Sequence, residues 1–143
     1  MAEPFSVRLR VRGYELDAQG HVNQAVYTQY AEHVRWEALL AAGISHEALA
    51  AAGVGPALLK MTIRFHRELR AGDDVDVSCA FDWRAGKLLE LVQDFRLPDR
   101  TAVAKLTATI GLIDLDTRTL VADPRGRFAA LATAPEALGL VGA

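Results

Sequence analysis

The residues whose types and spacing could do chemistry lie between Tyr14 and Tyr27. Asp17 comes first, and His21 and Asn23 follow a glycine, just before a long run with helical periodicity. The start of a helix carries backbone N–H groups without intrahelical partners, and a partial positive charge. A carboxylate in the preceding loop, beside such donors, suits attack on an acyl group, either directly or through water.

The neighbouring polar residues are weaker candidates for catalysis. Glu15 could be a second carboxylate, but it looks exposed, which favours a structural role or contact with solvent. His21 is expected mainly to shape the turn, with a hydrogen bond across it or to a partner chain. Asn23 suits a helix cap better than a catalytic amide. No serine lies in a Gly-x-Ser-x-Gly context, so a Ser-His-Asp triad has no support.

Composition limits the possible partners and locations. The 143 residues, 51% of them hydrophobic and 24% charged, predict one globular domain over 1–143. A net charge of −2 argues against nucleic-acid binding. The first residues lack the apolar core of a secretory signal, and no apolar run approaches the ~20 residues of a membrane span. We therefore predict a cytoplasmic protein with no nucleic-acid or membrane partner.

Cysteine and histidine usage argues against a metal. The one cysteine, Cys79, excludes an intramolecular disulfide and a multi-cysteine zinc site. It alternates in phase with Val75, Val77 and Phe81, which predicts a buried structural thiol. The four histidines have no metal-ligand spacing such as HExxH. We expect no metal and no cofactor.

Hydrophobic periodicity predicts the elements that must position these residues. Alternation predicts strands over 6–12, 59–66, 74–83, 88–97 and 101–114, with Gly111 as a candidate bulge. A long helix is expected from Asn23 to Ala42, stopped by Gly43, followed by a short helix over 45–52. A helix or partly ordered tail is expected from Pro124. The apolar stripe of the long helix is predicted to be Val26, Tyr27, Tyr30, Ala31, Val34, Ala38 and Leu39.

The order of these elements is typical of an α+β fold. One strand precedes the two helices, and four strands, expected to form a meander, follow them. The long helix would extend about 30 Å at ~1.5 Å per residue, which suggests a central element. A five-stranded antiparallel sheet curled around it is the simplest way to bury its stripe, with the core over about 6–114.

At these residues the chain resembles the hotdog-fold acyl-CoA thioesterases, specifically the 4-hydroxybenzoyl-CoA thioesterase-like group. The agreement in element order extends over roughly Val7 to Asp114. The second matching stretch, 63–73, resembles a strand that ends in a Gly-Asp turn in that family. The individual matching residues are Asp17, the run Gly20-His21-Val22-Asn23, Tyr27, Tyr30, Glu32 and Arg35.

The resemblance implies hydrolysis of an acyl-CoA thioester to the free acid and CoA. The active sites would lie at the interface of a hotdog dimer, and such dimers commonly pair into tetramers. Asp17 matches the catalytic carboxylate, a nucleophile or a general base for water. The backbone N–H of Gln24 matches the donor that polarises the thioester carbonyl, and this role does not depend on its side chain.

Several residues are candidates for substrate contacts. The aromatic residues Tyr27, Tyr30 and Trp36 could line an acyl pocket, although we expect two of the three to be plain core. Five basic residues could meet CoA phosphates, with solvation as the simpler interpretation for any one: Arg64, Arg67, Arg70, Arg84 and Lys87. The predicted substrate-binding set is Gly20, Val22, Tyr27, Tyr30, Arg64 and Arg67, where Gly20 supplies a backbone conformation that other residues resist.

Other functions stay open at this point. An acyl-ACP thioesterase would use the same chemistry on a different carrier. A non-catalytic acyl-CoA-binding module is possible because fold does not fix function, although an intact Asp17 argues for chemistry. A hotdog hydratase or dehydratase would carry a His-x-x-x-Gly-x-Pro loop, which does not occur. Aromatic, short-chain and long-chain acyl groups are all compatible with the sequence.

Overall fold

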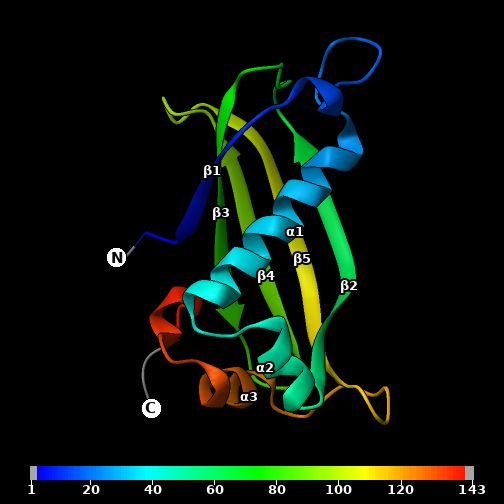
Figure 1. Ribbon diagram of the computed structural model, residues 1–143, viewed down its shortest axis with the longest axis vertical. Coiled ribbons are helices and arrows are strands. Elements are labelled where there is room, and N and C mark those ends of the chain that lie inside the picture. The colour runs from blue at the N-terminus through cyan, green and yellow to red at the C-terminus, as the bar shows by residue number, and fades with distance from the viewer. Residues whose placement is uncertain (1–2, 141–143) are drawn as a thin grey trace.

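The computed structural model describes residues 3–140, which form one antiparallel sheet packed against a long helix (Figure 1). The strands are β1 (Phe5–Arg10), β2 (Val54–Phe65), β3 (Asp74–Trp83), β4 (Leu88–Arg96) and β5 (Ala102–Asp114). The α-helices are α1 (Gln24–Ala41), α2 (His46–Ala51) and α3 (Pro124–Leu131), and short 3-10 helices cover Gly13–Glu15 (η1) and Pro135–Leu138 (η2). The predicted α+β arrangement, five antiparallel strands around one long helix, is confirmed.

The strand order corrects the predicted four-strand meander. The order is β1-β3-β4-β5-β2, so only β3, β4 and β5 follow one another as neighbours. β2 pairs with β5 at one edge, and β1 pairs with β3 at the other. The segment between β2 and β3 therefore crosses the end of the sheet. An alternating pattern identifies the buried face of a strand but not its neighbour, which is why the predicted meander of four strands was wrong.

β2 also differs from its prediction in length and regularity. It begins at Val54 and not at Leu59, and therefore contains Pro56. A proline is tolerated there because β2 is an edge strand, on one side of which no N–H donor is needed. The predicted bulge at Gly111 is wrong, since that residue pairs regularly with Ala57 and the irregularity falls at Leu59. A Cβ at Gly111 would instead collide with the side chain of Leu120.

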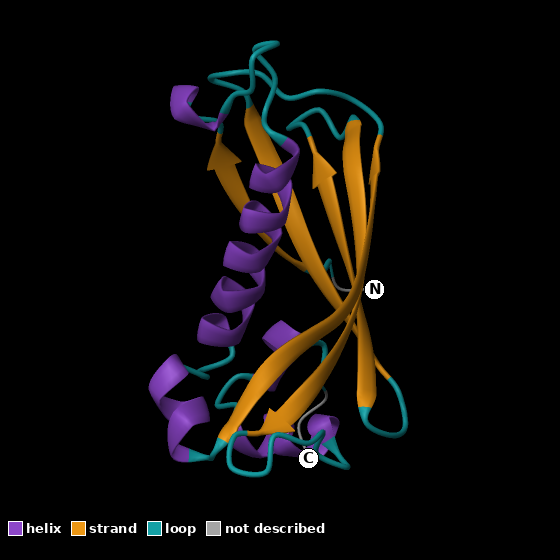
Figure 2. Cartoon of the chain, turned by 90° about the vertical axis from the view of Figure 1, so that its right-hand side faces the viewer, coloured by secondary structure: helices purple, strands orange, loops and turns teal. Residues whose placement is uncertain are grey.

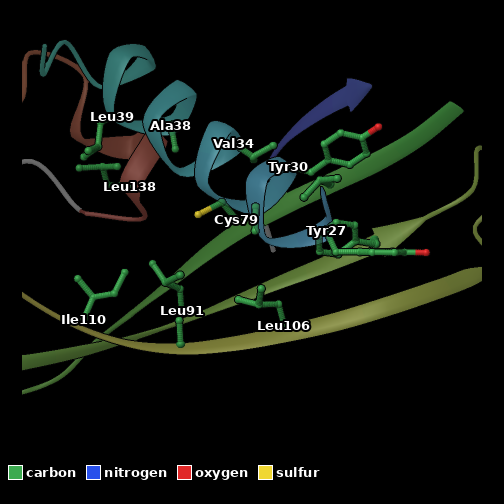
Figure 3. Close-up of a cluster of buried hydrophobic side chains, with 14 of the residues drawn as sticks. Tyr27, Tyr30, Val34, Ala38, Leu39, Cys79, Leu91, Leu106, Ile110 and Leu138 are labelled. Carbon is green, nitrogen blue, oxygen red and sulfur yellow. The ribbon is translucent and has the colours of Figure 1, made fainter. Parts of the chain in front are cut away.

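Helix α1 buries the stripe that its periodicity predicts. Its buried residues are the seven named above, and Figure 3 shows five of them facing Cys79, Leu91, Leu106 and Ile110 of the sheet. Asn23 caps its start, since Oδ1 accepts from the N–H of Ala25 at 2.9 Å. At its end Gly43 takes a positive φ of 86°, as expected for a helix stop. The helix runs diagonally across the concave face of the sheet (Figure 2).

Two features of β3 connect it to the core. One is the buried thiol of Cys79, and the other is the contact between Trp83 and η2. Cys79 is buried as predicted, and this raises the pKa of its thiol to about 12, so it stays protonated near neutral pH. The indole N–H of Trp83 donates to the carbonyl of Leu138 at 2.7 Å, which fastens η2 to β3. No helix within residues 3–140 is long and apolar enough to cross a membrane.

Glu15 corrects an expectation from the sequence, because it is buried and only 8% exposed. Its Oε1 accepts from the hydroxyl of Tyr30 at 2.5 Å and from the N–H of Arg12 at 2.8 Å. Burial alone would raise the pKa of Glu15, but these hydrogen bonds outweigh it and hold the pKa below its usual range. The ionised carboxylate is thus a structural acceptor under the start of α1.

We expect Tyr30→Phe to lower the free energy of unfolding by about 1.5–3 kcal/mol near neutral pH, because the substitution removes a donor to a buried carboxylate. The pKa of Glu15 is lowered by folding, so this contribution is complete above the unfolded pKa and disappears as the pH falls through the folded pKa. Urea unfolding at several pH values measures it. Tyr14→Phe is the control, since Tyr14 is 83% exposed, and equal effects of the two substitutions would contradict the account.

Candidate active site

The loop before α1 is closed on itself by the side chain and backbone of Asp17. Its Oδ1 accepts from the N–H groups of Gln19 at 2.9 Å and His21 at 3.1 Å. Its own N–H donates to the carbonyl of His21 at 2.7 Å. Gly20 has a positive φ of 80°, which completes the turn at low conformational cost. Both measured contacts use Oδ1, so Oδ2 of Asp17 has no hydrogen-bond partner within residues 3–140.

The same loop is fastened to the segment that follows β2. The N–H of Val22 donates to the carbonyl of Leu69 at 2.8 Å, and Nε2 of His21 lies 2.7 Å from Oε2 of Glu68. A hydrogen bond from Arg70 is the largest influence that lowers the pKa of Glu68, which favours its charged form beside the imidazole. His21 thus contacts the neighbouring segment of its own chain.

The first turn of α1 offers one free donor to this loop. Asn23 engages the amides of Ala25 through its side chain and Val26 through its carbonyl. The N–H of Gln24 makes no hydrogen bond to any described residue. Because the amides at a helix start point outward along the axis and carry partial positive charge, this N–H is suited to an anion or a developing oxyanion.

These groups open into one hollow of about 470 Å³. Its walls come from the loop and start of α1 on one side and from the end of β2 on the other. Phe65 and Tyr27 meet edge-to-face there, with ring centroids 5.0 Å apart, and make the apolar part of the wall. The lining residues are Asp17, His21, Val22, Asn23, Gln24, Tyr27, Phe65, Arg67 and Glu68.

The hollow gathers most of the predicted site residues but not all. Tyr30 is buried next to Glu15 instead, and Gly20 shapes the loop without lining the cavity. Arg64 is exposed and lies on the opposite face of β2 from Phe65, because neighbouring strand residues alternate. Asp17 is itself exposed within the chain, so this chain alone does not shield its carboxylate from water.

Two lining residues, Phe65 and Glu68, were missed by the sequence analysis. Phe65 lay in a predicted strand without an assigned role, and it is 47% exposed at the edge of the sheet. Glu68 stood in the Gly-Asp turn segment with no indication of its contact with His21. Within residues 3–140, no group of three or more acidic, histidine or cysteine side chains is arranged to hold a metal ion.

A second, more apolar cavity of about 230 Å³ lies under the other half of α1. It is walled by the helix, by the helix-facing side of β2, β3, β4 and β5, and by Phe128 of α3. Trp36, one of the three aromatic residues considered for an acyl pocket, lines this cavity. Tyr30 is a buried core residue, and Tyr27, which is also buried, lines the hollow at Asp17.

Comparison with known proteins places the chain in a family. Residues 11–139 match the thioesterase-like superfamily, which covers most of the sequence. The chain belongs to this superfamily. The crystal structure of the probable thioesterase YbaW from Escherichia coli superposes with a TM-score of 0.76 at 28% identity, over 82% of this chain and 89% of that one. The fold is therefore the hotdog fold that the sequence resembles.

Two relatives carry names that specify a carrier. The long-chain acyl-CoA thioesterase FadM of Escherichia coli is 29% identical over 119 residues, 82% of this chain and 89% of FadM. The chloroplastic acyl-acyl carrier protein thioesterase ATL3 of Arabidopsis thaliana is 44% identical over 73 residues, 51% of this chain. The match spans only 38% of the length of ATL3.

We expect Asn23→Ala to lower the free energy of unfolding by about 1 kcal/mol, because it removes the cap of α1 and leaves the amide of Ala25 without its partner. Asn23→Ser, which keeps a capping oxygen, should stay within a few tenths of a kcal/mol of the native protein. Denaturant unfolding of both variants measures the difference. Equal stabilities for the alanine and serine variants would show that the cap contributes nothing.

Proposed function

We propose that the protein is a thioesterase that hydrolyses an acyl-CoA to the free acid and CoA. One observation carries the proposal: Asp17, whose Oδ2 has no described partner, and Gln24, whose N–H has none, line the same hollow in a member of the thioesterase-like superfamily. The carboxylate of Asp17 can attack the thioester or activate a water molecule, and the N–H of Gln24 can stabilise the negative charge that develops on the carbonyl oxygen.

The chemistry that follows needs only these two groups and water. Asp17 takes a proton from a water molecule whose oxygen attacks the thioester carbon, and the resulting oxyanion accepts a hydrogen bond from Gln24. Collapse of this intermediate breaks the carbon–sulfur bond, and the CoA sulfur leaves with the proton that Asp17 returns. In the alternative, Asp17 attacks the carbonyl carbon directly, the carbon–sulfur bond breaks and CoA leaves as the thiolate. Water then hydrolyses the mixed anhydride, which releases the acid, restores Asp17 and supplies the proton that the thiolate takes up. Both routes give the free acid and CoA.

The other residues of the hollow have supporting roles in this proposal. Asn23 and His21 are positioning residues, because they fix the helix start and the turn that hold Gln24 and Asp17. Val22, Tyr27 and Phe65 provide apolar contact for the acyl group beside the thioester. Arg67 at the rim is the candidate for a CoA phosphate, since a guanidinium suits bidentate contact with phosphate. Tyr30 and Arg64 have no contact with this hollow.

The carrier is proposed to be CoA, as in the name of FadM, which aligns over most of this chain. An acyl-ACP thioesterase is the second candidate, because a relative that is 44% identical over 51% of this chain is named for that carrier. The chemistry at Asp17 is the same for both. A cytoplasmic location stays a prediction.

We also propose that the protein forms a homodimer through the edge of β2. The opposite edge, β1, has six residues and carries Arg8 and Arg10 in ion pairs with β3, whereas β2 has twelve residues. Its helix-facing side exposes Leu58 (47%), Met61 (38%) and Phe65 (47%). A long, apolar edge strand with unpaired backbone groups is a template for a second copy.

Such a dimer would complete the site. Two copies of β2 related by a two-fold axis pair in antiparallel fashion, about 4.8 Å apart. The Phe65 end of one copy then lies opposite the Pro56 end of the other, so the partner would cover the exposed Asp17 and exclude water. Pairing of dimers into a tetramer remains part of the proposal.

We expect Asp17→Asn to lower kcat for acyl-CoA hydrolysis at least about a hundredfold, equivalent to about 2.7 kcal/mol of barrier, because the amide can neither attack nor take a proton. Release of CoA thiol from a panel of acyl-CoAs measures it. Asp114→Asn is a matched control, because Oδ1 of Asp114 likewise accepts two backbone N–H groups, those of Asp116 and Thr117.

The outcomes separate the candidate functions. A loss of acyl-CoA hydrolysis in Asp17→Asn, together with full activity in Asp114→Asn, supports the mechanism. Full activity in the Asp17 variant would remove this residue from its role. Bound but unhydrolysed acyl-CoA would favour a binding module, and turnover of acyl-ACP alone would favour the second carrier.

For the dimer, we expect Met61→Glu to produce monomers at micromolar concentration and to lower activity in parallel, because the two-fold axis would bring two carboxylates together. Thr62→Glu adds the same charge to the opposite face of β2 and should leave the dimer intact. Analytical ultracentrifugation gives the mass of each variant. A dimeric Met61→Glu protein, or a monomeric native protein with full activity, would contradict this interface.

A further inference from the structure

The cavity under the second half of α1 contains a polar feature that its apolar walls do not require. Glu32 and Arg35 come from the helix, next to Trp36 and Leu39, and the remaining walls are apolar. The residues of α1 that line the cavity, from Glu32 to Leu39, belong to its second half, away from the helix start that holds Gln24.

Arg35 is a half-buried cation with little to compensate it. Its Nη1 donates to Oε1 of the buried Gln93 at 3.1 Å, while Nε2 of Gln93 donates to the carbonyl of Ala31 at 3.0 Å. No other side-chain hydrogen bond and no ion pair to Arg35 is present within residues 3–140. Burial lowers the pKa of Arg35, and the group remains charged because a guanidinium does not deprotonate in proteins.

The unused donors of Arg35 reach open space. A guanidinium has five N–H groups, and the hydrogen bond to Gln93 employs one of them. Among the described residues, no side-chain nitrogen or oxygen is both buried and without a partner. The free donors of Arg35 are therefore accessible to solvent, and Arg35 is one of the residues that line the cavity. Glu32 stands one turn earlier on the same helix face and adds an acceptor.

A hydroxyl group is the ligand group that satisfies both residues. It accepts a hydrogen bond from the guanidinium and donates its own hydrogen to the carboxylate, and it brings no charge into an apolar cavity. A methyl group in the same place would leave the guanidinium donors unpaired on binding, which is unfavourable for a desolvated group. A carboxylate would satisfy Arg35 but would be repelled by Glu32.

We propose that this cavity receives the distal end of the acyl chain and selects a chain that ends in a hydroxyl group, with Arg35 as donor and Glu32 as acceptor. This inference rests on the proposed function, because it assigns the acyl group of the same reaction. In the proposed dimer, the hollow at Asp17 adjoins the Pro56 end of the partner, and Pro56 and Leu58 belong to the wall of this cavity. An acyl chain could pass from one hollow to the other along the exposed side of β2.

The test compares unsubstituted acyl-CoAs from decanoyl to hexadecanoyl with their terminal hydroxy counterparts. We expect the native protein to prefer the hydroxy chain by at least about tenfold in kcat/KM at its best length, since a site built to bind a hydroxyl disfavours the analogue that lacks it. Arg35→Met should abolish this preference, so that the ratio of the two kcat/KM values falls to about one. Arg125→Met on the exposed surface of α3 is the control and should change neither value.

A second variant covers a failure of Arg35→Met to fold, since Gln93 loses its donor there. Glu32→Gln is on an exposed position and keeps the side-chain shape, and we expect it to reduce the preference at least about threefold, because an amide accepts the hydroxyl hydrogen less strongly than a carboxylate. A native protein without preference at any length, or a preference unchanged in these variants, would overturn the proposal.

Binding distinguishes this proposal from the proposed function. If no thioester is hydrolysed, the thioesterase proposal fails, and the cavity is then tested by titrating terminal hydroxy fatty acids and plain fatty acids against Trp36 fluorescence. Tighter binding of the hydroxy acid, lost in Arg35→Met, would support the cavity assignment alone. Equal binding of the two acids would overturn it.

Discussion

Burial of one apolar stripe of α1 against the concave face of the sheet is the constraint on which the rest of the structure depends. Ala31 and Ala38 are fully buried, so the helix approaches the strands closely, and larger residues such as Tyr27 and Leu39 fill the space at either end. Since the stripe fixes both the rotation and the position of the helix, it also fixes where its first amides point. The free N–H of Gln24 is thus placed by hydrophobic packing several turns away.

Glu15 connects this packing to the loop that carries Asp17. Its carboxylate accepts from Tyr30, a residue of the buried stripe, while its backbone carbonyl accepts from the N–H of Asn23 at 2.9 Å. One residue therefore joins the core, the cap of α1 and the start of the loop that carries Asp17. Asp17 then needs only two backbone amides to hold its orientation, and its second oxygen remains available to substrate or water. The active-site geometry follows from interactions that are mostly outside the site.

The sequence predicted the fold where periodicity alone carries the information. The seven buried residues of α1, the cap at Asn23 and the bounds of β3 followed from spacing, because burial on one face repeats along the chain. The position of β2, the burial of Glu15 and the contact of His21 with Glu68 did not, because each depends on a neighbour distant in sequence. One wall of the hollow at Asp17, formed by the loop and the start of α1, was predicted from the sequence. The opposite wall, which includes Phe65 and Glu68, was not predicted, because it depends on where the chain crosses the end of the sheet.

The central claim is that Asp17 and the amide of Gln24 act on the same thioester carbonyl. A crystal structure with a non-hydrolysable thioether or ketone analogue of an acyl-CoA tests it most directly. The account predicts a carbonyl oxygen within about 3 Å of the Gln24 nitrogen, in an analogue that retains it, with the carboxylate of Asp17 or a bound water facing the carbonyl carbon. A carbonyl oxygen held by other donors, with Asp17 turned away from the carbon, would contradict the account.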